Sequence, residues 1–439
     1  MKQIMDGCTA ATHVAFALSD VATIYPITPV ASMGETAQKW GMQGRKNYMG
    51  MPMSVKEMES ELGAAGATHG AAAAGALATT FTNSQGLMLM ISNMYKIAGN
   101  RLPVVFHVGA RSLATHALSI FGDHQDVMAT RATGFAFLCS TSVQEVMDLA
   151  AVAHLAALEG STPVCHFFDG WRTSNEMSTI DVIPYSDLFS LIDREKVQAF
   201  RARALNPEHP VLRGSAQNPD VYFQNAEAQN PFYDRFPAIV QEKMDALAAV
   251  IGRQYHLFDY HGAADASTVV IAMGSSCKVA ELTVDYLNSH GYKAGVVTVH
   301  LFRPFSPEAL IKAIPPTVRT VVTLDRTKEP GADGEPLYKD VATALLTYGS
   351  GHFASSLPRI MGGRYGLSSK DFTPAMVKAI LDEAAKPAPR RFFTVGITDD
   401  VTKLSLDVDS SFMLPVEGVT SAIFYGFGSD GTGGAPRQA

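Results

Sequence analysis

The sequence of 439 residues has only four cysteines, and no two of them are spaced as C-x-x-C. Cys8, Cys139, Cys165 and Cys277 therefore predict no metal or iron–sulfur site built by this chain alone. They also imply no disulfide framework. This indicates a reducing compartment, and we expect a cytoplasmic protein.

The sequence is also poor in charge and in strongly hydrophobic runs. Charged residues make up 18% of the chain, the net charge is −7, and no cluster of Lys and Arg occurs. The most apolar long stretch, residues 63–81, is rich in Ala and Gly and too weakly hydrophobic to span a bilayer. The N-terminus lacks the basic and apolar regions of a signal peptide. We therefore expect neither a nucleic acid nor a membrane as partner.

What the sequence does contain is an alternation of strand-like and helix-like segments. The strand-like runs near the start cover residues 21–27, 79–82, 102–111, 134–141 and 162–170. Helical patterns such as residues 143–158 separate them, which predicts an α/β domain with a mainly parallel, doubly wound sheet. Ligands of such sheets bind at the carboxyl ends of the strands, which directs attention to Thr28, Ser84, Arg111 and Asp169.

The length of the chain predicts two or three domains. We expect a first domain over residues 1–260, in which residues 187–260 form a long ordered excursion whose aromatic side chains need burial. A second α/β domain is expected over residues 261–411, with strands in "STVVIA", "AGVVTVHLFRPF" and "TVRTVVTLD". Residues 412–439 are expected to begin a third domain, in which a strand at residues 421–425 runs into a Gly-rich loop.

Three residues are candidates for binding chemistry, and each has a plainer structural alternative. Thr28 lies between Pro26 and Pro29, which fix the backbone, so it is either a rigidly held ligand or a threonine in a turn. Glu61 precedes a surface of small residues, where a partly buried carboxylate needs a partner such as a ligand nitrogen. The alternative is a solvated glutamate favoured by the helix dipole. Arg111, after an apolar strand, can hold a carboxylate bidentately.

Other polar loops give weaker signals. His124 has aspartates close by on both sides, but the spacing matches no strong metal-binding pattern. Asp169, Arg172 and Thr173 follow another strand, and they either line a site or pair with each other. The loop "DRTKEPGADGEP" matches neither a phosphate loop nor a dinucleotide fingerprint, so we expect a surface loop or a domain contact there.

A series of motifs, in order, resembles the pyruvate:ferredoxin (flavodoxin) oxidoreductase family over nearly the whole chain. These motifs are "YPITP", "EMESELGAAGATHGA", "TNSQGLMLMISNMYKIAG", "HALSIFGDHQDVMATR", "FFDGWRTS", "NPEHP", "LFRPF", "DRTKEPGA" and "GGRYGLSSKDF". One such string would be weak, but this many in order make coincidence implausible. The first domain resembles a thiamine-pyrimidine-type domain, and the second resembles a transketolase-C-terminal-like domain.

The resemblance implies an enzyme that oxidatively decarboxylates pyruvate to acetyl-CoA and carbon dioxide with thiamine diphosphate. Electrons would pass through [4Fe-4S] clusters to ferredoxin or flavodoxin, and coenzyme A would be a substrate. The clusters, Mg²⁺ and the diphosphate half of the cofactor site are expected on further domains or on a second subunit. This chain is thus expected to be a separate subunit or a truncated piece that is inactive alone, within a homodimeric core.

The resemblance also implies roles for individual residues. Thr28 matches a threonine whose hydroxyl contacts the substrate, and Arg111 matches an arginine that holds the 2-oxoacid carboxylate. Glu61 matches the glutamate that bonds N1′ of the thiamine pyrimidine, and residues 82–86 are expected to approach the same ring. The terminal Gly-rich loop resembles one that approaches the phosphates of coenzyme A. Its residues expected to bind are Ser429, Asp430, Gly431 and Thr432.

Departures from the family pattern leave alternatives open. Val30 and Ala31 stand where the family often has two serines, and Glu59 and Leu62 stand where Gln and Ala are usual. These changes replace no catalytic group, although they lie close enough to alter the pocket. One alternative is a non-catalytic assembly module that keeps the fold. Another is the same chemistry on a different 2-oxoacid, such as 2-oxobutyrate or oxaloacetate, because Arg111 recognises only the carboxylate.

Overall fold

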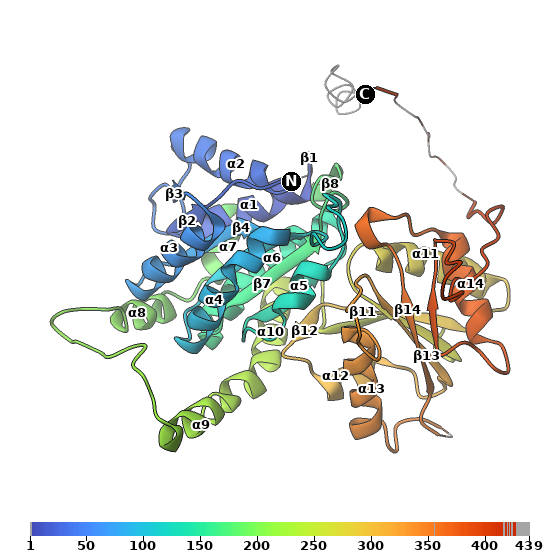
Figure 1. Cartoon of the computed structure of the whole chain (residues 1–439). Coiled ribbons are helices and arrows are strands. Elements are labelled where there is room, and N and C mark those ends of the chain that lie inside the picture. Colours follow the sequence, from blue (N-terminus) through green and yellow to red (C-terminus); the bar gives the residue numbers. More distant parts are fainter. Residues whose placement is uncertain are drawn as a thin grey trace.

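The computed structural model describes residues 2–354, 356–415, 418, 420, 422, 425 and 426. Two α/β domains lie side by side, the first drawn from blue to green and the second from yellow to red (Figure 1). Each has a sheet flanked by helices, and the two sheets are separate apart from one short strand that crosses between them. Most of the strand expected at residues 421–425, and all of Ser429, Asp430, Gly431 and Thr432, lie outside the described residues.

The first sheet has seven strands, of which six are parallel, as the alternating pattern predicts. From edge to edge they are β12 (Leu301–Arg303), β6 (Ala136–Ser140), β7 (Val164–Asp169), β5 (Val105–Ala110), β4 (Ala78–Thr82), β2 (Val21–Ile24) and β3 (Ser54–Glu57). β12 is the antiparallel member, and it pairs with β6.

The helices of this domain form two layers. One group contains α1 (Gly7–Leu18), α6 (Val143–Gly160) and α10 (Asn230–Ile251), and the other α3 (Glu61–Ala73), α4 (Ser84–Gly99) and α5 (Gln125–Thr130). α2 (Ala31–Met42) follows β2. α6 begins where Ser142 accepts a hydrogen bond from the N–H of Glu145, a typical N-cap. The small pair β1 (Lys2–Met5) and β8 (Ser178–Asp181) is antiparallel.

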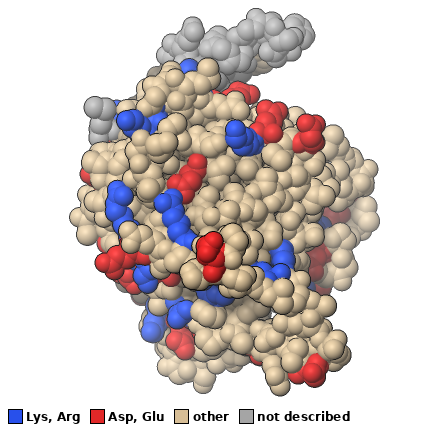
Figure 2. All heavy atoms as spheres, turned by 90° about the vertical axis from the view of Figure 1, so that its left-hand side faces the viewer, with Lys and Arg blue, Asp and Glu red and all other residues tan. Residues whose placement is uncertain are grey.

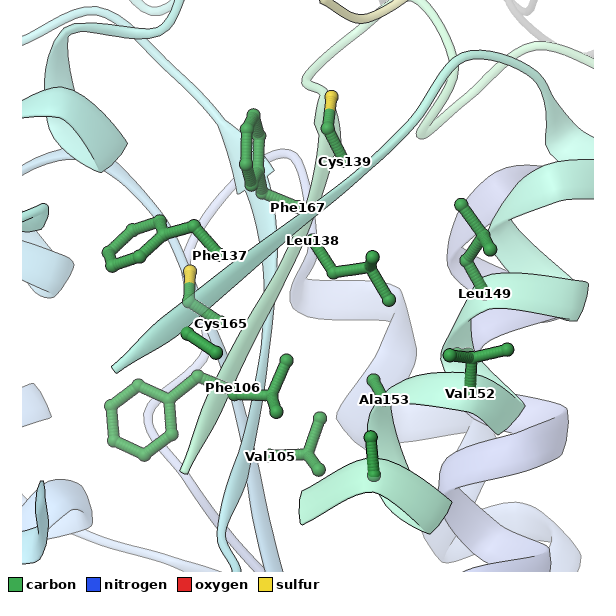
Figure 3. Packing of buried hydrophobic residues seen from close by; sticks show 14 of the residues in the cluster. Val105, Phe106, Phe137, Leu138, Cys139, Leu149, Val152, Ala153, Cys165 and Phe167 are labelled. Carbon is green, nitrogen blue, oxygen red and sulfur yellow. The ribbon is translucent and has the colours of Figure 1, made fainter. Parts of the chain in front are cut away.

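The core of the first domain lies where α6 packs on the central strands (Figure 3). Val105 and Leu138 point toward Leu149 and Val152 of α6, whereas the fully buried rings of Phe106, Phe137 and Phe167 point to the other side of the strands. Strands covered on both faces read as continuous apolar runs, which is why they were recognisable in the sequence. This packed core fixes the carboxyl ends of the strands, and the candidate site lies there.

The excursion after the first sheet folds as helices, but part of it is not buried. It contains α7 (Tyr185–Leu191), α8 (Arg194–Ala202) and α9 (Pro219–Glu227) before α10. The expectation that its aromatic residues are buried is wrong for Tyr222 and Phe223, which are 65% and 71% exposed. α9 has no buried residue, because it lies away from the body of the domain (Figure 1).

The second sheet has six strands. In order they are β15 (Phe392–Thr394), β14 (Arg359–Arg364), β13 (Thr320–Asp325), β10 (Thr268–Ala272), β11 (Ala294–Val299) and β9 (Phe258–Gly262). All are parallel except β9. Its helices are α11 (Ser276–Ser289), α12 (Pro307–Ala313), α13 (Pro336–Tyr348) and α14 (Pro374–Ala384), with the short 3-10 helix η1 (Leu367–Ser369).

One strand prediction needs correction. The run "AGVVTVHLFRPF" is not one strand of the second sheet, because the chain divides at His300 into β11 and β12. β11 stays in the second sheet, while β12 joins the edge of the first. The sequence could not reveal this division, since both halves are apolar and the partner strand β6 is far away along the chain.

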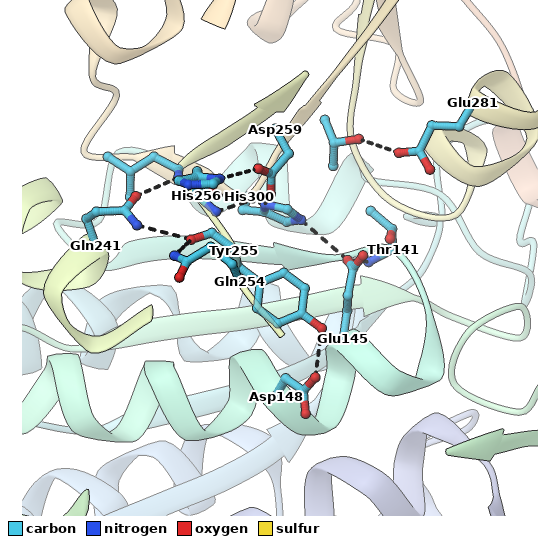
Figure 4. Close-up of polar contacts among 12 residues, drawn as sticks. Thr141, Glu145, Asp148, Gln241, Gln254, Tyr255, His256, Asp259, Glu281 and His300 are labelled. Carbon is cyan, nitrogen blue, oxygen red and sulfur yellow. Dashed lines mark hydrogen bonds and ion pairs between the residues drawn. The ribbon is translucent and has the colours of Figure 1, made fainter. Parts of the chain in front are cut away.

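Buried ionic groups fill the junction between the two domains (Figure 4). The His300 ring lies 3.4 Å from a carboxylate oxygen of Glu145 on α6 and 3.3 Å from one of Asp259 on β9. These two carboxylates outweigh the effect of burial and raise the pKa of His300 to about 10. The same pairing lowers the pKa of Glu145 to about 2. The junction is thus held by charges from both domains.

A second buried cluster joins the domains near the candidate site. Asp169, at the end of β7, accepts hydrogen bonds from His124 at 2.6 Å and from the Ser275 N–H at 2.8 Å. Arg326 of the second domain pairs with the same carboxylate at 2.7 Å. These partners hold the pKa of Asp169 far below its usual range. The loop "DRTKEPGADGEP", which contains Arg326, therefore contacts the first domain.

Charges are spread thinly on the surface. On the face shown in Figure 2, basic and acidic side chains are interspersed, and wide areas carry neither. In the described part of the chain, no helix has the length and apolar character needed to cross a membrane.

Candidate functional site

Two of the three predicted site residues meet at the carboxyl ends of β2 and β5. Arg111 directly follows β5, and its Nη1 donates a hydrogen bond of 2.8 Å to the carbonyl oxygen of Thr28. Thr28 follows β2 and is exposed, and its hydroxyl has no hydrogen-bond partner among the described residues. Burial lowers the pKa of Arg111, but the guanidinium stays charged at neutral pH. The site therefore places a fixed cation beside an open hydroxyl.

Glu61, the third predicted residue, is the first residue of α3. Ser60 caps this helix by accepting a hydrogen bond from the N–H of Gly63 at 3.1 Å. The Glu61 side chain belongs to a residue only 8% exposed, yet its carboxylate has no hydrogen-bond or ion-pair partner among the described residues. The carboxylate oxygens do not belong to the fully enclosed polar atoms without a partner in the described chain, so they face solvent or an open space. The carboxylate is therefore available to a polar ligand group.

The turn between β4 and α4 connects Glu61 with Arg111. Asn83, in this turn, places its Oδ1 3.5 Å from Nη1 of Arg111. Gly86, one turn into α4, faces Glu61: a Cβ on Gly86 would lie 2.8 Å from Cγ of Glu61 and 2.7 Å from Oγ1 of Thr82. Glu61 and Arg111 thus both lie beside this turn, and Thr28 is linked to it through Arg111.

Several polar groups around this turn have no partner in the described part of the chain. They are Oγ1 of Thr82, Nδ2 of Asn83 and Nε of Arg111. Buried polar groups are nearly always hydrogen-bonded, so a cluster of three unpaired groups beside an unpaired carboxylate is unusual for a plain core. The set offers both donors and an acceptor to a bound molecule.

Asp126 supports the site from behind, a role that sequence reasoning missed. Its Oδ2 accepts the N–H groups of Ser84 at 2.7 Å and Arg111 at 3.0 Å, and its Oδ1 accepts that of Val127 at 2.7 Å. Burial raises the pKa of Asp126 to about 7 despite these three donors. Ser84 has a φ of +49°, and the Asp126 bond helps to hold this left-handed backbone. In the sequence, this aspartate drew attention only as a candidate metal ligand near His124.

The other polar residues that the sequence singled out lie outside this site. His124 and Asp169 bind each other within the domain junction, so His124 forms no cluster with its neighbouring aspartates. Arg172 pairs with Asp371 of the second domain, and the Thr173 hydroxyl has no partner among the described residues. Asp169, Arg172 and Thr173 therefore do not pair with each other. In the described part of the chain, no three His, Cys, Asp or Glu side chains are grouped as a metal site would need.

A doubly wound parallel domain with unpaired polar groups at its strand ends belongs to the class of α/β proteins that bind small organic ligands there. A family model described as pyruvate flavodoxin/ferredoxin oxidoreductase, thiamine diphosphate-binding, matches residues 13–245. Another, pyruvate:ferredoxin oxidoreductase core domain II, matches residues 266–366. The chain therefore belongs to the pyruvate flavodoxin/ferredoxin oxidoreductase family, as its motifs indicated.

Relatives match along the whole chain. A pyruvate:ferredoxin oxidoreductase from Moorella thermoacetica is 58% identical over 100% of this chain and 37% of its own length. A pyruvate-flavodoxin oxidoreductase from Rhodospirillum rubrum is 56% identical over 99% of this chain and 37% of its own length. The chain thus spans little more than a third of the length of these relatives.

A solved structure confirms the fold class. It is a 2-oxoglutarate:ferredoxin oxidoreductase from Magnetococcus marinus with 2-oxoglutarate, coenzyme A and succinyl-CoA bound. It is similar with a TM-score of 0.64 over 88% of this chain and 65% of that one. At 18% identity, this likeness concerns the fold alone.

Proposed function

We propose that this chain holds the 2-oxoacid and the pyrimidine half of thiamine diphosphate in an enzyme that converts pyruvate to acetyl-CoA and carbon dioxide. The observation that carries the proposal is Glu61, a residue only 8% exposed whose carboxylate has no partner among the described residues and lies beside Gly86. Such a carboxylate can accept a hydrogen bond from a ligand.

The residues present fit the pyrimidine half of the cofactor. Glu61 would accept a hydrogen bond from the protonated ring nitrogen N1′, and the missing side chain at Gly86 leaves room beside that carboxylate. Thr82 and Asn83 offer further polar groups that no described residue pairs. When bound, thiamine diphosphate supplies an electron sink for the decarboxylation of a 2-oxoacid.

Arg111 and Thr28 are placed to bind the 2-oxoacid substrate. The Arg111 guanidinium would hold the carboxylate of the 2-oxoacid, since its charge and its Nε, which bonds no described residue, favour an anionic oxygen. The hydroxyl of Thr28 would donate to the substrate from the end of β2. Asp126 and the Thr28 carbonyl hold Arg111 in place, so the side chain is oriented before substrate arrives.

The rest of the reaction needs groups supplied by other parts of the protein. Further domains or a second subunit would bring Mg²⁺, the diphosphate site and the [4Fe-4S] clusters that pass electrons to ferredoxin or flavodoxin. Coenzyme A would bind through Ser429, Asp430, Gly431 and Thr432, and two copies of the core would pair. The length of the relatives beyond this region supports such additional parts.

The test is Glu61→Gln in the enzyme assembled with the parts that the longer relatives contain. The amide keeps the size of the side chain but removes the charge that favours a protonated N1′. We expect pyruvate-dependent reduction of a viologen dye to fall by at least about 100-fold, in the range seen when an essential proton-transfer group is lost. Thiamine diphosphate content should fall as well.

Glu308→Gln is the matched control, because Glu308 is an exposed glutamate on α12 of the second domain and its change should leave the rate unchanged. Unchanged turnover of the Glu61 variant would overturn the proposal and favour a non-catalytic assembly module. Comparing pyruvate with 2-oxobutyrate and oxaloacetate in the same assay identifies the substrate, which the Arg111 contact alone does not select.

A further inference from the structure

Asp126 is a fully buried carboxyl group behind the candidate site, and it forms no ion pair with any described residue. Its three hydrogen bonds come from backbone N–H groups, those of Ser84, Arg111 and Val127. Buried carboxylates are usually paired with a basic side chain, so this arrangement is unusual. The backbone donors offset only part of the cost of burial, and the charged and neutral forms are both accessible near neutral pH.

The Asp126 carboxyl group contacts both chain segments that form the site. A single oxygen, Oδ2, accepts the N–H of Arg111, which follows β5, and the N–H of Ser84, in the turn between β4 and α4. The Ser84 hydroxyl also donates to the carbonyl oxygen of Ser112 at 2.6 Å, so the two segments are joined twice. A change of charge on Asp126 therefore acts directly on the segment that carries Arg111.

Few other charges surround this carboxyl group. Asp123, on the loop before α5, adds its negative charge to the effect of burial and further raises the pKa of Asp126. Cys165 of β7 is also coupled to it, but burial raises the pKa of that thiol so far that it stays neutral. α4 packs against α5, and its only charged residue, Lys96, lies near its far end. Burial lowers the pKa of Arg111, whereas the negative charge of Asp126 raises it, so these two groups are coupled.

We infer, on the basis of the proposed function, that Asp126 regulates the affinity of the site: the carboxylate of the 2-oxoacid binds Arg111 more tightly while Asp126 carries a proton. A charged Asp126 and the substrate carboxylate compete for the same guanidinium, and two negative charges close together in a buried site disfavour each other. Because linkage is reciprocal, the bound anion also makes Asp126 harder to deprotonate. Asp126 is thus a positioning residue that acts on the substrate through Arg111.

The affinity for an anionic substrate should therefore change with pH in one direction. The pKa of Asp126 is about 7 in the chain without a ligand, so the group is mostly neutral at pH 6 and mostly charged at pH 8. Affinity should be highest near pH 6 and fall as pH rises through 7. It should become constant again once Asp126 is charged in the substrate-bound state as well.

The experiment measures the inhibition constant of oxamate, an unreactive anionic analogue of pyruvate, in the assembled enzyme at pH 6, 7, 8 and 9. We expect this constant to rise at least fivefold from pH 6 to pH 9. Asp126→Asn, a neutral side chain of the same size, should keep it within about twofold of the value that the unaltered enzyme has at pH 6.

Asp325→Asn is the matched control. Asp325 is also a buried carboxyl group with a pKa of about 7, and it accepts the N–H groups of Leu337 and Tyr338. It lies at the end of β13 in the second domain, away from Arg111. Its variant should keep the full pH dependence of the oxamate constant.

The same pH dependence in Asp126→Asn and in the unaltered enzyme would overturn this inference and leave the proposed function intact. An oxamate constant that is unchanged in Arg111→Gln would instead contradict the proposed substrate site, and this inference with it. Calorimetry of oxamate binding at pH 7.5, in two buffers of different ionisation enthalpy, provides a measurement on the unaltered enzyme alone. We expect uptake of a fraction of a proton, and its absence would overturn the inference even if the Asp126 variant did not fold.

Discussion

At the scale of single residues, the absence of a side chain at Gly86 matters as much as the presence of Glu61. A Cβ on Gly86 would lie 3.0 Å from Oε1 of Glu61 and closer still to its Cγ. Such contacts are not tolerated, so Glu61 or the first turn of α4 would have to move. The carboxylate is thus positioned by the packing of two helices, and no hydrogen bond from a described residue holds it.

Gly86→Ala tests this positioning in the assembled enzyme. We expect turnover to fall by about 100-fold, because displacing a reacting group by about 1 Å costs about that much. Gly99→Ala, at the other end of α4, is the control, since its Cβ would meet nothing within 4 Å. Steady-state dye reduction measures both variants. Full activity of the Gly86 variant would show that Glu61 tolerates displacement and is not the critical group.

The buried carboxyl of Asp126 makes stability depend on pH. Its pKa in the folded chain is about 7, above the ordinary value of 3.8, so the folded state binds more protons between these values. The free energy of unfolding of the unaltered chain should therefore fall, relative to that of Asp126→Asn, as pH rises from about 4 to 7. The expected slope is about 1.4 kcal/mol for each pH unit. Above pH 7 the difference should be constant.

Urea unfolding of both proteins at pH 5, 6, 7 and 8 measures this trend, since the other titrating groups largely cancel in the difference. A difference that does not change over this range would mean that Asp126 keeps an ordinary pKa in the folded chain.

At the scale of elements, the sequence predicted a strand or helix correctly where the pattern of a single segment was enough to identify it. β5 and β7 are apolar on both faces and were found as strands, and α6 was found from its alternation with them. β12 was missed because periodicity describes a segment and not its partner. The contact between Arg111 and Thr28 agrees with the strand-end rule, whereas Glu61 was a candidate because of the small residues that follow it and because of the family motifs. Asp126 was not foreseen, because its role depends on a backbone turn that no pattern encodes.

The junction between β11 and β12 yields a prediction about His300. Its pKa of about 10 lies above the ordinary value of 6.5, so its stabilisation is fully present below about pH 6.5 and is lost as pH rises through 10. His300→Gln should lower the free energy of unfolding by about 3 kcal/mol at neutral pH, as breaking a buried ion pair does. The difference in the free energy of unfolding between the unaltered chain and His300→Gln should become smaller toward pH 10.

Thermal unfolding at pH 6.5, 8 and 10 measures the effect. His290→Gln, at an exposed histidine after α11, should unfold like the unaltered chain at every pH. A difference in stability between the unaltered chain and His300→Gln that stays constant with pH would show that His300 acts through its shape and not through its charge.

At the scale of the whole molecule, the two domains are joined tightly while one segment of the first remains apart. β12 and two buried ionic clusters hold the domains together. Residues 205–227, by contrast, contribute no buried residue, and Leu212 is 86% exposed. Exposed segments of this kind are preferred sites of proteolysis.

Limited digestion with trypsin should therefore cut first after Arg213, which lies in the irregular part of this segment. The expected products are two fragments of nearly equal size, identified by their intact masses. Arg213→Gln should remove this first cut and leave later ones unchanged. A first cut elsewhere would show that residues 205–227 are held more firmly than their exposure indicates.

The position of β12 also sets an order in time. The edge of the first sheet is closed by residues 301–303, so every residue before them is synthesised while that edge is still open. Until then β6 presents unpaired N–H and C=O groups, and such an edge can pair with other chains. The first domain is thus completed by the second during synthesis, and a ribosome that stalled between them would release a sheet prone to aggregate.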